Sequence, residues 1–217
     1  MIDLFLNLDK HLNDVVLQYG VWTYAILFLI IFCETGLVVT PFLPGDSLLF
    51  AAGVFAHPER GAFDLGLLMP LLILASFCGD NVNFWIGKKL GLRLFKNENS
   101  RFFKKKHLEK TRAYYEKHGT KTIILGRFVP IVRTFAPFVA GLDAMEYRKF
   151  LPASIIGAVT WVTVCTGAGY LFGRVPWVEQ NFSLAILVVV FLSFTGVFVE
   201  FVRARAKARR QARNPQS

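Results

Sequence analysis

Long apolar runs separated by short polar segments extend along most of the chain, and this pattern predicts a bundle of membrane-embedded helices. The runs 65–86, 150–172 and 182–202 each have about the 20 residues that an α-helix needs to cross a bilayer. A shorter run begins at residue 21. We therefore expect an all-α polytopic membrane protein with about four transmembrane helices.

The first 20 residues follow a different pattern, in which apolar positions alternate with acidic and basic ones at helical spacing. Such spacing predicts an amphipathic N-terminal helix over 1–20. The helix either lies along the membrane surface or caps the bundle as an ordinary soluble helix, and the pattern fits both placements equally well.

The stretch 122–141 is apolar overall but contains Arg127, Pro130, Arg133 and Pro137. An arginine near the bilayer centre costs at least about 2.5–3.5 kcal/mol, so its presence indicates a functional site. Six residues turn a helix by about 240°, so the two arginines converge only if the helix breaks between them. Because Pro130 breaks helices, we predict a re-entrant hairpin that directs both guanidinium groups into one cavity. The alternative is a kinked spanning helix whose arginines extend to the membrane surface.

A second apolar stretch, 34–56, is broken in the same way. Its charged and helix-breaking residues are Glu34, Pro41, Pro44, Gly45 and Asp46. On a straight helix Glu34 and Asp46 would lie about 18 Å apart, whereas a re-entrant hairpin brings the two carboxylates together. Asp46 or Ser47 suits the N-cap of the returning arm.

One further acid, Asp80, lies within the apolar run 65–86. It either faces the interior of the bundle or lies close enough to the interface to be hydrated. The sequence leaves both placements open.

Basic residues are concentrated in two segments of this chain, whose formal net charge is +10. Residues 88–121 hold twelve Lys or Arg against three Glu, and the tail 203–217 holds six basic residues and no acid. Beside apolar runs, such segments mark the cytoplasmic side by the positive-inside rule, so we expect no nucleic-acid partner. Two full spans and the stretch 122–141 separate them. If both basic segments are cytoplasmic, the chain crosses the membrane an even number of times between them, so 122–141 must turn back without crossing. The same count, with 34–56 also re-entrant, places the N-terminus in the cytoplasm.

Composition agrees with a single membrane domain over 1–217. The chain is 54% hydrophobic, contains 22 Phe and has a mean hydropathy of +0.45, which is far from a soluble domain of this length. No cleavable signal peptide is expected, because the first apolar run follows an acidic segment and lacks a basic start. Cys33, Cys78 and Cys165 lie in apolar stretches without paired spacing, so we expect neither a disulfide nor a metal site.

The two halves of the chain share a weak repeat. In each half a proline-bearing segment leads to small residues, at 51–53 or 140–141, and a later span closes in a Gly-x3-Gly pattern. The glycine pairs are Gly87/Gly91 and Gly169/Gly173. Paired broken segments point to a transporter with an inverted repeat and a substrate site between its halves. Chance similarity between apolar, glycine-rich segments is the alternative.

Four motifs, at 32–36, 42–48, 126–134 and 140–141, resemble the signature of the DedA family. This is the bacterial branch of the VTT superfamily, which also contains the SNARE-associated Golgi-type lipid scramblases. The resemblance covers almost the whole chain. It implies a bacterial inner-membrane protein with two re-entrant hairpins.

The resemblance also implies a function. Some members of the family move undecaprenyl phosphate across the bacterial membrane, and others sustain proton-motive force, envelope integrity and tolerance to alkali or drugs. The family's essential positions correspond to Glu34, Asp46, Arg127 and Arg133. Substrates differ within the family, so the resemblance defines the fold better than the cargo.

Residue chemistry gives the same four positions distinct roles. The planar forks of Arg127 and Arg133 suit bidentate phosphate binding, so we assign them to the substrate. Glu34 and Asp46 are assigned to proton coupling, with Glu34 preferred as the carrier, because a carboxylate that changes partners in a poorly hydrated pocket changes its proton affinity. The alternative is that the four residues only neutralise each other as buried ion pairs.

We expect no enzyme activity and no cofactor. Intramembrane phosphatases and transferases need a His nucleophile or clustered acids, but the four histidines lie outside the apolar runs and no Asp-x-x-Asp motif occurs. The expected partners are protons and an anionic lipid, either undecaprenyl phosphate or a phospholipid, and the sequence allows a homodimer. An uncoupled phospholipid scramblase and a proton-coupled antiporter of small solutes or drugs are the alternative functions.

Overall fold

The computed structural model describes residues 20–37, 45–58, 63–94, 115 and 119–173, with further single positions and short stretches between 175 and 189. All regular structure in this part of the chain is helical. The predicted N-terminal helix, most of the basic segment, Pro41, Pro44, the end of the last span and the basic tail lie outside the described residues.

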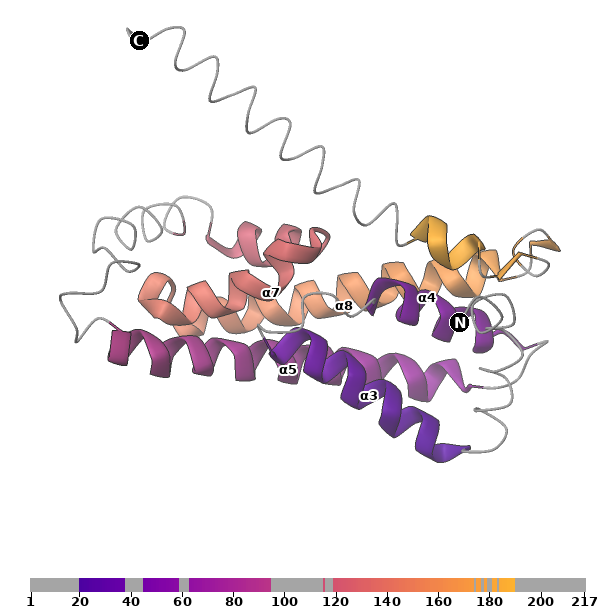
Figure 1. Ribbon diagram of the computed structural model, residues 1–217, viewed down its shortest axis with the longest axis horizontal. Coiled ribbons are helices and arrows are strands. Elements are labelled where there is room, and N and C mark those ends of the chain that lie inside the picture. Colours follow the sequence, from indigo (N-terminus) through magenta and orange to yellow (C-terminus); the bar gives the residue numbers. More distant parts are fainter. Residues whose placement is uncertain are drawn as a thin grey trace, which may run out of the picture.

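Two long antiparallel helices form the frame of the molecule, α5 (Leu65–Leu94) and α8 (Tyr147–Phe172). Each contains a 26-residue apolar segment, long enough to cross a membrane. Both confirm predicted spans, and Figure 1 shows them running in opposite directions along the longest axis. Helix α5 continues eight residues beyond the predicted end at 86 because lysine, arginine and leucine, which follow there, are strong helix formers.

Large apolar side chains remain exposed along the helices, as expected for surfaces that face lipid. Leu67 is 56% exposed, Leu125 64% and Leu171 69%. Exposed apolar area on this scale marks a membrane or partner contact. Together with the two long apolar helices, it supports a membrane protein.

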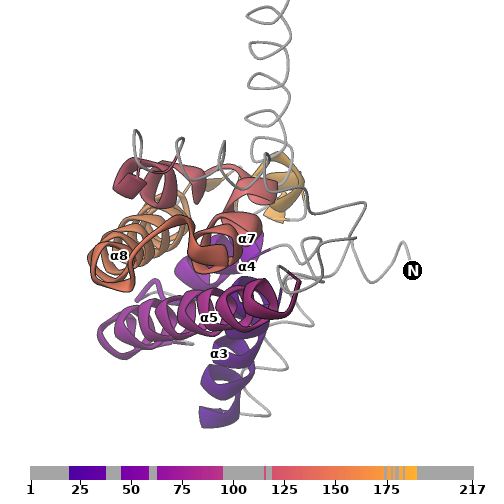
Figure 2. The same ribbon diagram turned by 90° about the vertical axis from the view of Figure 1, so that its left-hand side faces the viewer.

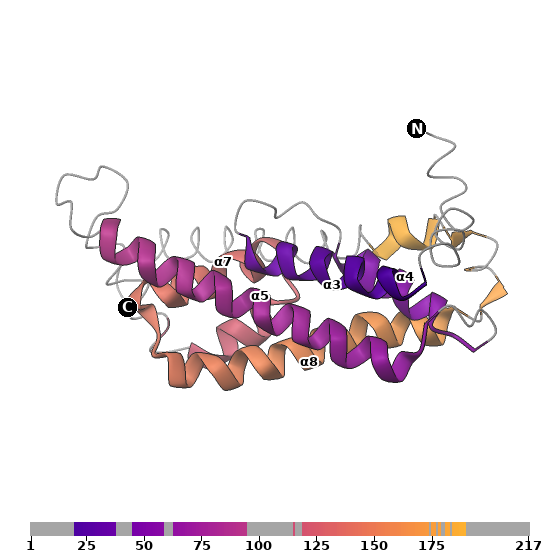
Figure 3. The ribbon, with the colours of Figure 1, turned by 90° about the horizontal axis from the view of Figure 1, so that it is seen from below.

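Helix α3 (Val21–Gly36) packs on α5 through glycine. A Cβ atom added to Gly79 would lie 1.8 Å from Thr35 Oγ1, so only glycine admits this approach. Viewed end-on, α5 lies between α3 and α8 (Figure 2), while α3 also contacts α4 and α7. From below, α3 lies along one half of α5, and α5 crosses α8 (Figure 3). The contact brings the C-terminal end of α3 to the middle of α5.

The helix within the arginine-bearing stretch is broken where proline predicted it. Residues 119–126 are helical, 127–129 form a turn, and α7 (Pro130–Val139) begins at the proline. A missing N–H costs nothing in a first helical turn. The second arm then continues as a short π-helix, η1 (Ala140–Ala144). The two arms thus extend three residues beyond each end of the predicted range, and its re-entry into the membrane stays a prediction.

The described contacts also repeat between the two halves. Helix α4 (Gly45–Phe55) packs on α8, where a Cβ added to Gly53 would lie 2.0 Å from the carbonyl oxygen of Thr166. In the other half η1 packs on α5, and a Cβ added to Gly141 would lie 2.0 Å from the carbonyl oxygen of Phe84.

A reciprocal pair of contacts accompanies these two. A Cβ added to Gly169 would lie 1.9 Å from the carbonyl oxygen of Phe50, and one added to Gly87 would lie 2.1 Å from that of Phe138. These contacts show which positions correspond in the two halves. In the short arms, 53 corresponds to 141 and 50 to 138, an offset of 88 residues. In the long helices, 84 corresponds to 166 and 87 to 169, an offset of 82 residues. Each short arm therefore packs on the long helix of the opposite half, in agreement with the predicted repeat.

Two apolar cores lie toward the two ends of the frame. One contains Leu72 and Ala75 of α5 with most of α4, and the other contains Phe84 with Phe150 of α8. Between them along α5 the buried residues are polar: Ser76, Asp80 and Asn83. The polar residues between the cores form the candidate site.

Candidate functional site

Arg133 of α7 binds two carboxylates that come from the two arms of the broken segment 34–56. Its Nη2 atom donates to Glu34 Oε1, and its Nη1 donates to Asp46 Oδ1 at 2.6 Å. Glu34 and Arg133 are buried, whereas the side chain of Asp46 is 18% exposed. We call these three residues the Arg133 cluster. The structure thus brings together three of the four site residues that the sequence singled out.

The Glu34 carboxylate also binds the first turn of α4. Its Oε1 accepts a hydrogen bond of 3.1 Å from the backbone N–H of Gly45, where the helix dipole favours an anion. A Cβ added to Gly45 would lie 1.7 Å from Glu34 Oε2, so the carboxylate fits only over glycine. The prediction that Asp46 or Ser47 caps this helix is wrong, because α4 already begins at Gly45.

Arg127 has a separate set of partners. Its Nη2 atom donates to Asp80 Oδ2, and its Nη1 donates to Ser76 Oγ at 2.5 Å. The Ser154 hydroxyl on α8 donates to the same oxygen of Asp80 at 2.7 Å. All four residues are buried, and we call them the Arg127 cluster. Asp80 thus faces the interior of the bundle.

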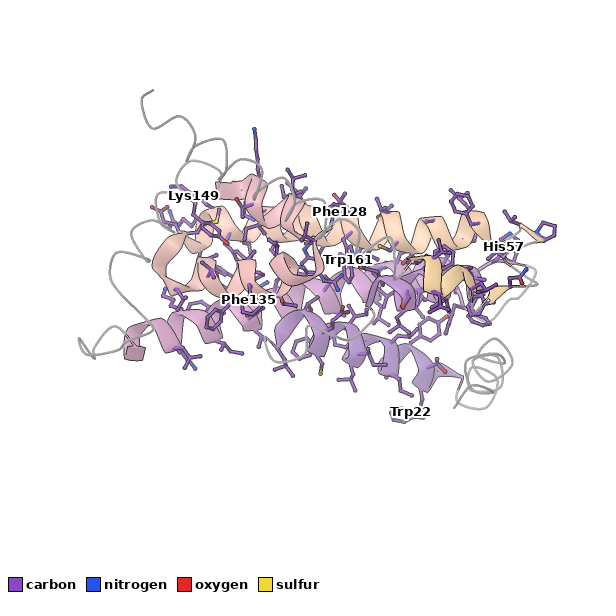
Figure 4. The ribbon with its side chains drawn as sticks, turned by 45° about the horizontal axis from the view of Figure 1, so that its top comes forward. Trp22, His57, Phe128, Phe135, Lys149 and Trp161 are labelled. Carbon is purple, nitrogen blue, oxygen red and sulfur yellow. The ribbon has the colours of Figure 1, made fainter. Side chains whose placement is uncertain are left out.

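The two arginines do not share an acid, but they share an aromatic ring. The Cζ atoms of Arg133 and Arg127 lie 4.6 Å and 5.8 Å from the ring centroid of Trp161, within cation–π range. The indole Nε1 donates to Asp46 Oδ1 at 2.7 Å. Trp161 therefore joins both clusters, and Figure 4 places it between His57 toward one end and Lys149 toward the other.

Sequence reasoning missed Trp161 as a site residue, although a signal was present. Tryptophan in membrane proteins concentrates at the water interfaces. Trp161 instead lies near the middle of a 26-residue apolar segment, where an indole N–H needs a protein acceptor.

Asn83 joins both broken segments to α5. Its Nδ2 donates to the carbonyl oxygens of Thr35 at 3.0 Å and Thr134 at 2.8 Å. These residues directly follow Glu34 and Arg133 in the chain, and Asn83 is 0% exposed. Its amide group therefore helps to hold the two members of the ion pair in register.

The site lies at mid-depth in the frame. Asp80 is residue 16 of the 30 in α5, so about 20 Å of helix extends on each side of it. The hydrocarbon core of a bilayer is about 30 Å thick. A frame that spans the membrane places both clusters near its centre, where an unpaired charge is costly.

The formal charges of the two clusters do not balance. Glu34, Asp46 and Asp80 face Arg127 and Arg133, which leaves −1 when every group is ionised. Oδ1 of Asp80, Oε2 of Glu34 and the Nε atoms of both arginines are buried without a hydrogen-bond partner. The carboxylate oxygens can thus accept further hydrogen bonds, the Nε atoms can donate them, and the site can take up one positive charge.

The remaining predicted residues are placed as follows. Pro130 is the first residue of α7, and Pro137 lies inside that helix and is buried. Within the described ranges no group of three potential ligands could hold a metal ion. Cys33, Cys78 and Cys165 form no disulfide within the described ranges.

Matches to known proteins cover most of the chain. Residues 43–171 match the family model of the VTT domain. The chain is 52% identical over 213 residues to Protein DedA of Escherichia coli strain K12, covering 98% of this chain and 97% of that protein. It is 45% identical over 201 residues to the uncharacterized membrane protein Rv0364 of Mycobacterium tuberculosis strain H37Rv, covering 91% and 87%.

A more distant relative carries a cellular location in its name. The inner membrane protein YqjA of Escherichia coli strain K12 is 34% identical over 179 residues, which cover 80% of each chain. No solved structure matches.

Proposed function

This chain belongs to the DedA family of VTT-domain membrane proteins, and from that premise we propose that it transports an anionic lipid, such as undecaprenyl phosphate, across the bacterial inner membrane. One observation carries the proposal above the others. Two buried arginines lie near the middle of the frame, beside interrupted helices, and both are bound to carboxylates. Interrupted helices at the interface of two repeats are where transporters bind substrate.

The arginines supply the recognition chemistry. A guanidinium fork binds the oxygens of a phosphate bidentately and keeps its charge at every working pH. The α4 N-terminus, now occupied by the Glu34 carboxylate, adds a second place where an anion is favoured. The exposed apolar faces of the helices would accommodate the lipid chain outside the polar site.

The carboxylates supply the coupling in this proposal. Substrate phosphate occupies Arg133 in one state, and Glu34 and Asp46 occupy it in the other. A carboxylate released from its arginine takes a proton and stops competing with the phosphate. Because binding free energies are reciprocal, proton and substrate then favour each other's binding. In this proposal the protein catalyses no chemical reaction. Its two termini lie in the cytoplasm.

The test is lipid flux in proteoliposomes that contain the purified protein. Labelled undecaprenyl phosphate should cross faster than in empty vesicles, and a pH gradient should change the rate. Arg133→Gln should abolish the protein-dependent flux, whereas Arg148→Gln removes an exposed arginine and serves as the matched control.

Two other outcomes of the flux experiment would replace this proposal by a different function. Flux of phospholipids and undecaprenyl phosphate alike, without response to the gradient, would identify an uncoupled scramblase. No lipid flux, together with proton-linked movement of a small solute, would replace the lipid proposal with an antiporter.

A further inference from the structure

The Arg127 cluster has no part in the exchange proposed for Glu34 and Asp46, yet it holds the second buried arginine. We propose that Asp80 competes with the transported anion for Arg127. Its carboxylate binds the guanidinium in the ligand-free protein and gives way when an anionic head group binds. The inference rests on the proposed function, because it requires that the parent protein binds an anionic head group.

The guanidinium group of Arg127 is already occupied by protein groups. Both terminal nitrogens of Arg127 already donate to protein oxygens, one to Asp80 Oδ2 and one to Ser76 Oγ. The side chains of Arg127 and Asp80 are only 2% and 1% exposed. A phosphate therefore gains the fork of Arg127 only by displacing Asp80, which makes the two anions competitors.

The hydrogen bonds of the Arg127–Asp80 pair are incomplete. Arg127 Nε and Asp80 Oδ1 are buried without a hydrogen-bond partner, whereas a buried ion pair is favourable only when its remaining donors and acceptors are bonded. A phosphate group has three strong acceptor oxygens and a carboxylate has two. In place of the carboxylate, phosphate offers acceptors to Nε, to the terminal nitrogens and to the hydroxyls of Ser76 and Ser154.

Asp80 and Arg127 are anchored in different kinds of backbone. Asp80 lies in the middle of α5, a continuous 30-residue helix. Arg127 lies in the turn between two helices, where Phe128 and Val129 donate short-range bonds of 3.2 Å and 3.0 Å to Leu125 and Gly126. The turn therefore lets the Arg127 guanidinium separate from the carboxylate as phosphate enters, while the backbone of Asp80 stays fixed in α5.

The stem of Arg127 packs closely on the bare backbone of α8 at a glycine. A Cβ added to Gly157 on α8 would lie 2.9 Å from Arg127 Cδ, so the arginine stem passes over a glycine. On this side the stem meets backbone, and no side chain of residue 157 opposes its motion.

The experiment measures binding of farnesyl phosphate to the full-length protein in detergent, with farnesol as the uncharged control. Asp80→Asn keeps the shape of the side chain and removes its charge, so the phosphate should bind about tenfold tighter or more. A purely structural pair predicts the opposite sign, because loss of the acid damages the site. Asp64→Asn makes the same change in net charge at an exposed loop position and should bind like the parent.

Two further variants separate the possible outcomes. Asp80→Glu retains the charge and should bind no tighter than the parent. If Asp80→Asn does not fold, Asp80→Asn with Arg127→Gln removes both charges, and the double variant should bind more weakly than the parent because Arg127 is lost. Unchanged affinity in the folded Asp80→Asn protein, or parent-like affinity in the double variant, overturns the inference. Absence of phosphate binding by the parent itself instead overturns the proposed function.

Discussion

At the scale of single residues, each buried charge of the candidate site is bound by groups from other segments of the chain. Arg133 bridges two acids from separate helices, and Glu34 divides its carboxylate between that arginine and the start of α4. Removing one partner of a buried pair costs about 3–5 kcal/mol, because an uncompensated charge remains. Conservative substitutions therefore test mechanism better than alanine does.

Arg133→Lys should lower transport at least about tenfold while expression stays near normal. Lysine keeps the charge but has a single nitrogen, which cannot hold two acids or two phosphate oxygens in the geometry of a fork. Lipid flux in proteoliposomes checks this prediction, with Arg148→Lys as the exposed control. If lysine at both 127 and 133 transports like the parent, only net charge matters and bidentate recognition is wrong.

Glu34→Gln should bind the anionic head group at least as well as the parent and lose the response to a pH gradient. Glutamine resembles the protonated acid, so it does not compete with phosphate for Arg133 and has no proton to exchange. Head-group binding measured from pH 6 to pH 9 checks this. A pH dependence as steep as the parent's would remove Glu34 from the proton pathway.

Gly45→Ala should abolish transport and lower the unfolding temperature. The new methyl group would occupy the position of Glu34 Oε2, so the carboxylate must leave both Arg133 and the α4 N–H. Gly167→Ala is the control, since no atom beyond its own stretch of helix lies within 4 Å of its Cβ position and alanine improves a helix by about 1 kcal/mol. A Gly45→Ala protein with parental flux would show that Glu34 need not lie there.

At the scale of elements, interrupted helices position the charges and a continuous helix aligns the interruptions. Asn83 of α5 bonds to both broken segments at once. Its register on α5 therefore sets how the end of α3 meets α7.

Asn83→Asp should destabilise the protein by about 2–4 kcal/mol, because it loses two donated hydrogen bonds and leaves two carbonyl groups without that donor. Asn81→Asp is the matched control on the same helix, where the amide donates a single bond to Phe77. Thermal unfolding in detergent compares the two. Equal stability of both variants would show that Asn83 does not join the segments.

At the scale of the whole molecule, the repeated glycine contacts interlock the halves, and charge distribution predicts how the frame lies in the membrane. We expect cysteines at 121 and 145, introduced into a protein without native cysteines, to react from the same cytoplasmic side. These positions flank the predicted hairpin 122–141, whose re-entry requires this result. Labelling from opposite faces would show that the segment crosses completely.

Much of this architecture could be predicted from the chain alone. Apolar run lengths predicted both long helices, and Pro130 predicted the break before α7, because these signals are local. The pairing of acids with arginines was not predictable. The Arg127 cluster joins residues 47 to 74 positions apart, and the way the turn 127–129 and α8 pack against α5 decides that Asp80 receives Arg127.

The separation between Glu34 and Arg133, 99 residues along the chain, has a consequence for how the protein is made. At about 5–20 residues per second, a ribosome needs about 5–20 s to reach the arginine after the acid. The surface of α8 that receives α4 is synthesised later still, since it lies near Thr166 and Gly169. The first half of the protein therefore enters the membrane before the charge and the helix that complete it exist, and until then its acids have water, protons or the insertion machinery as partners.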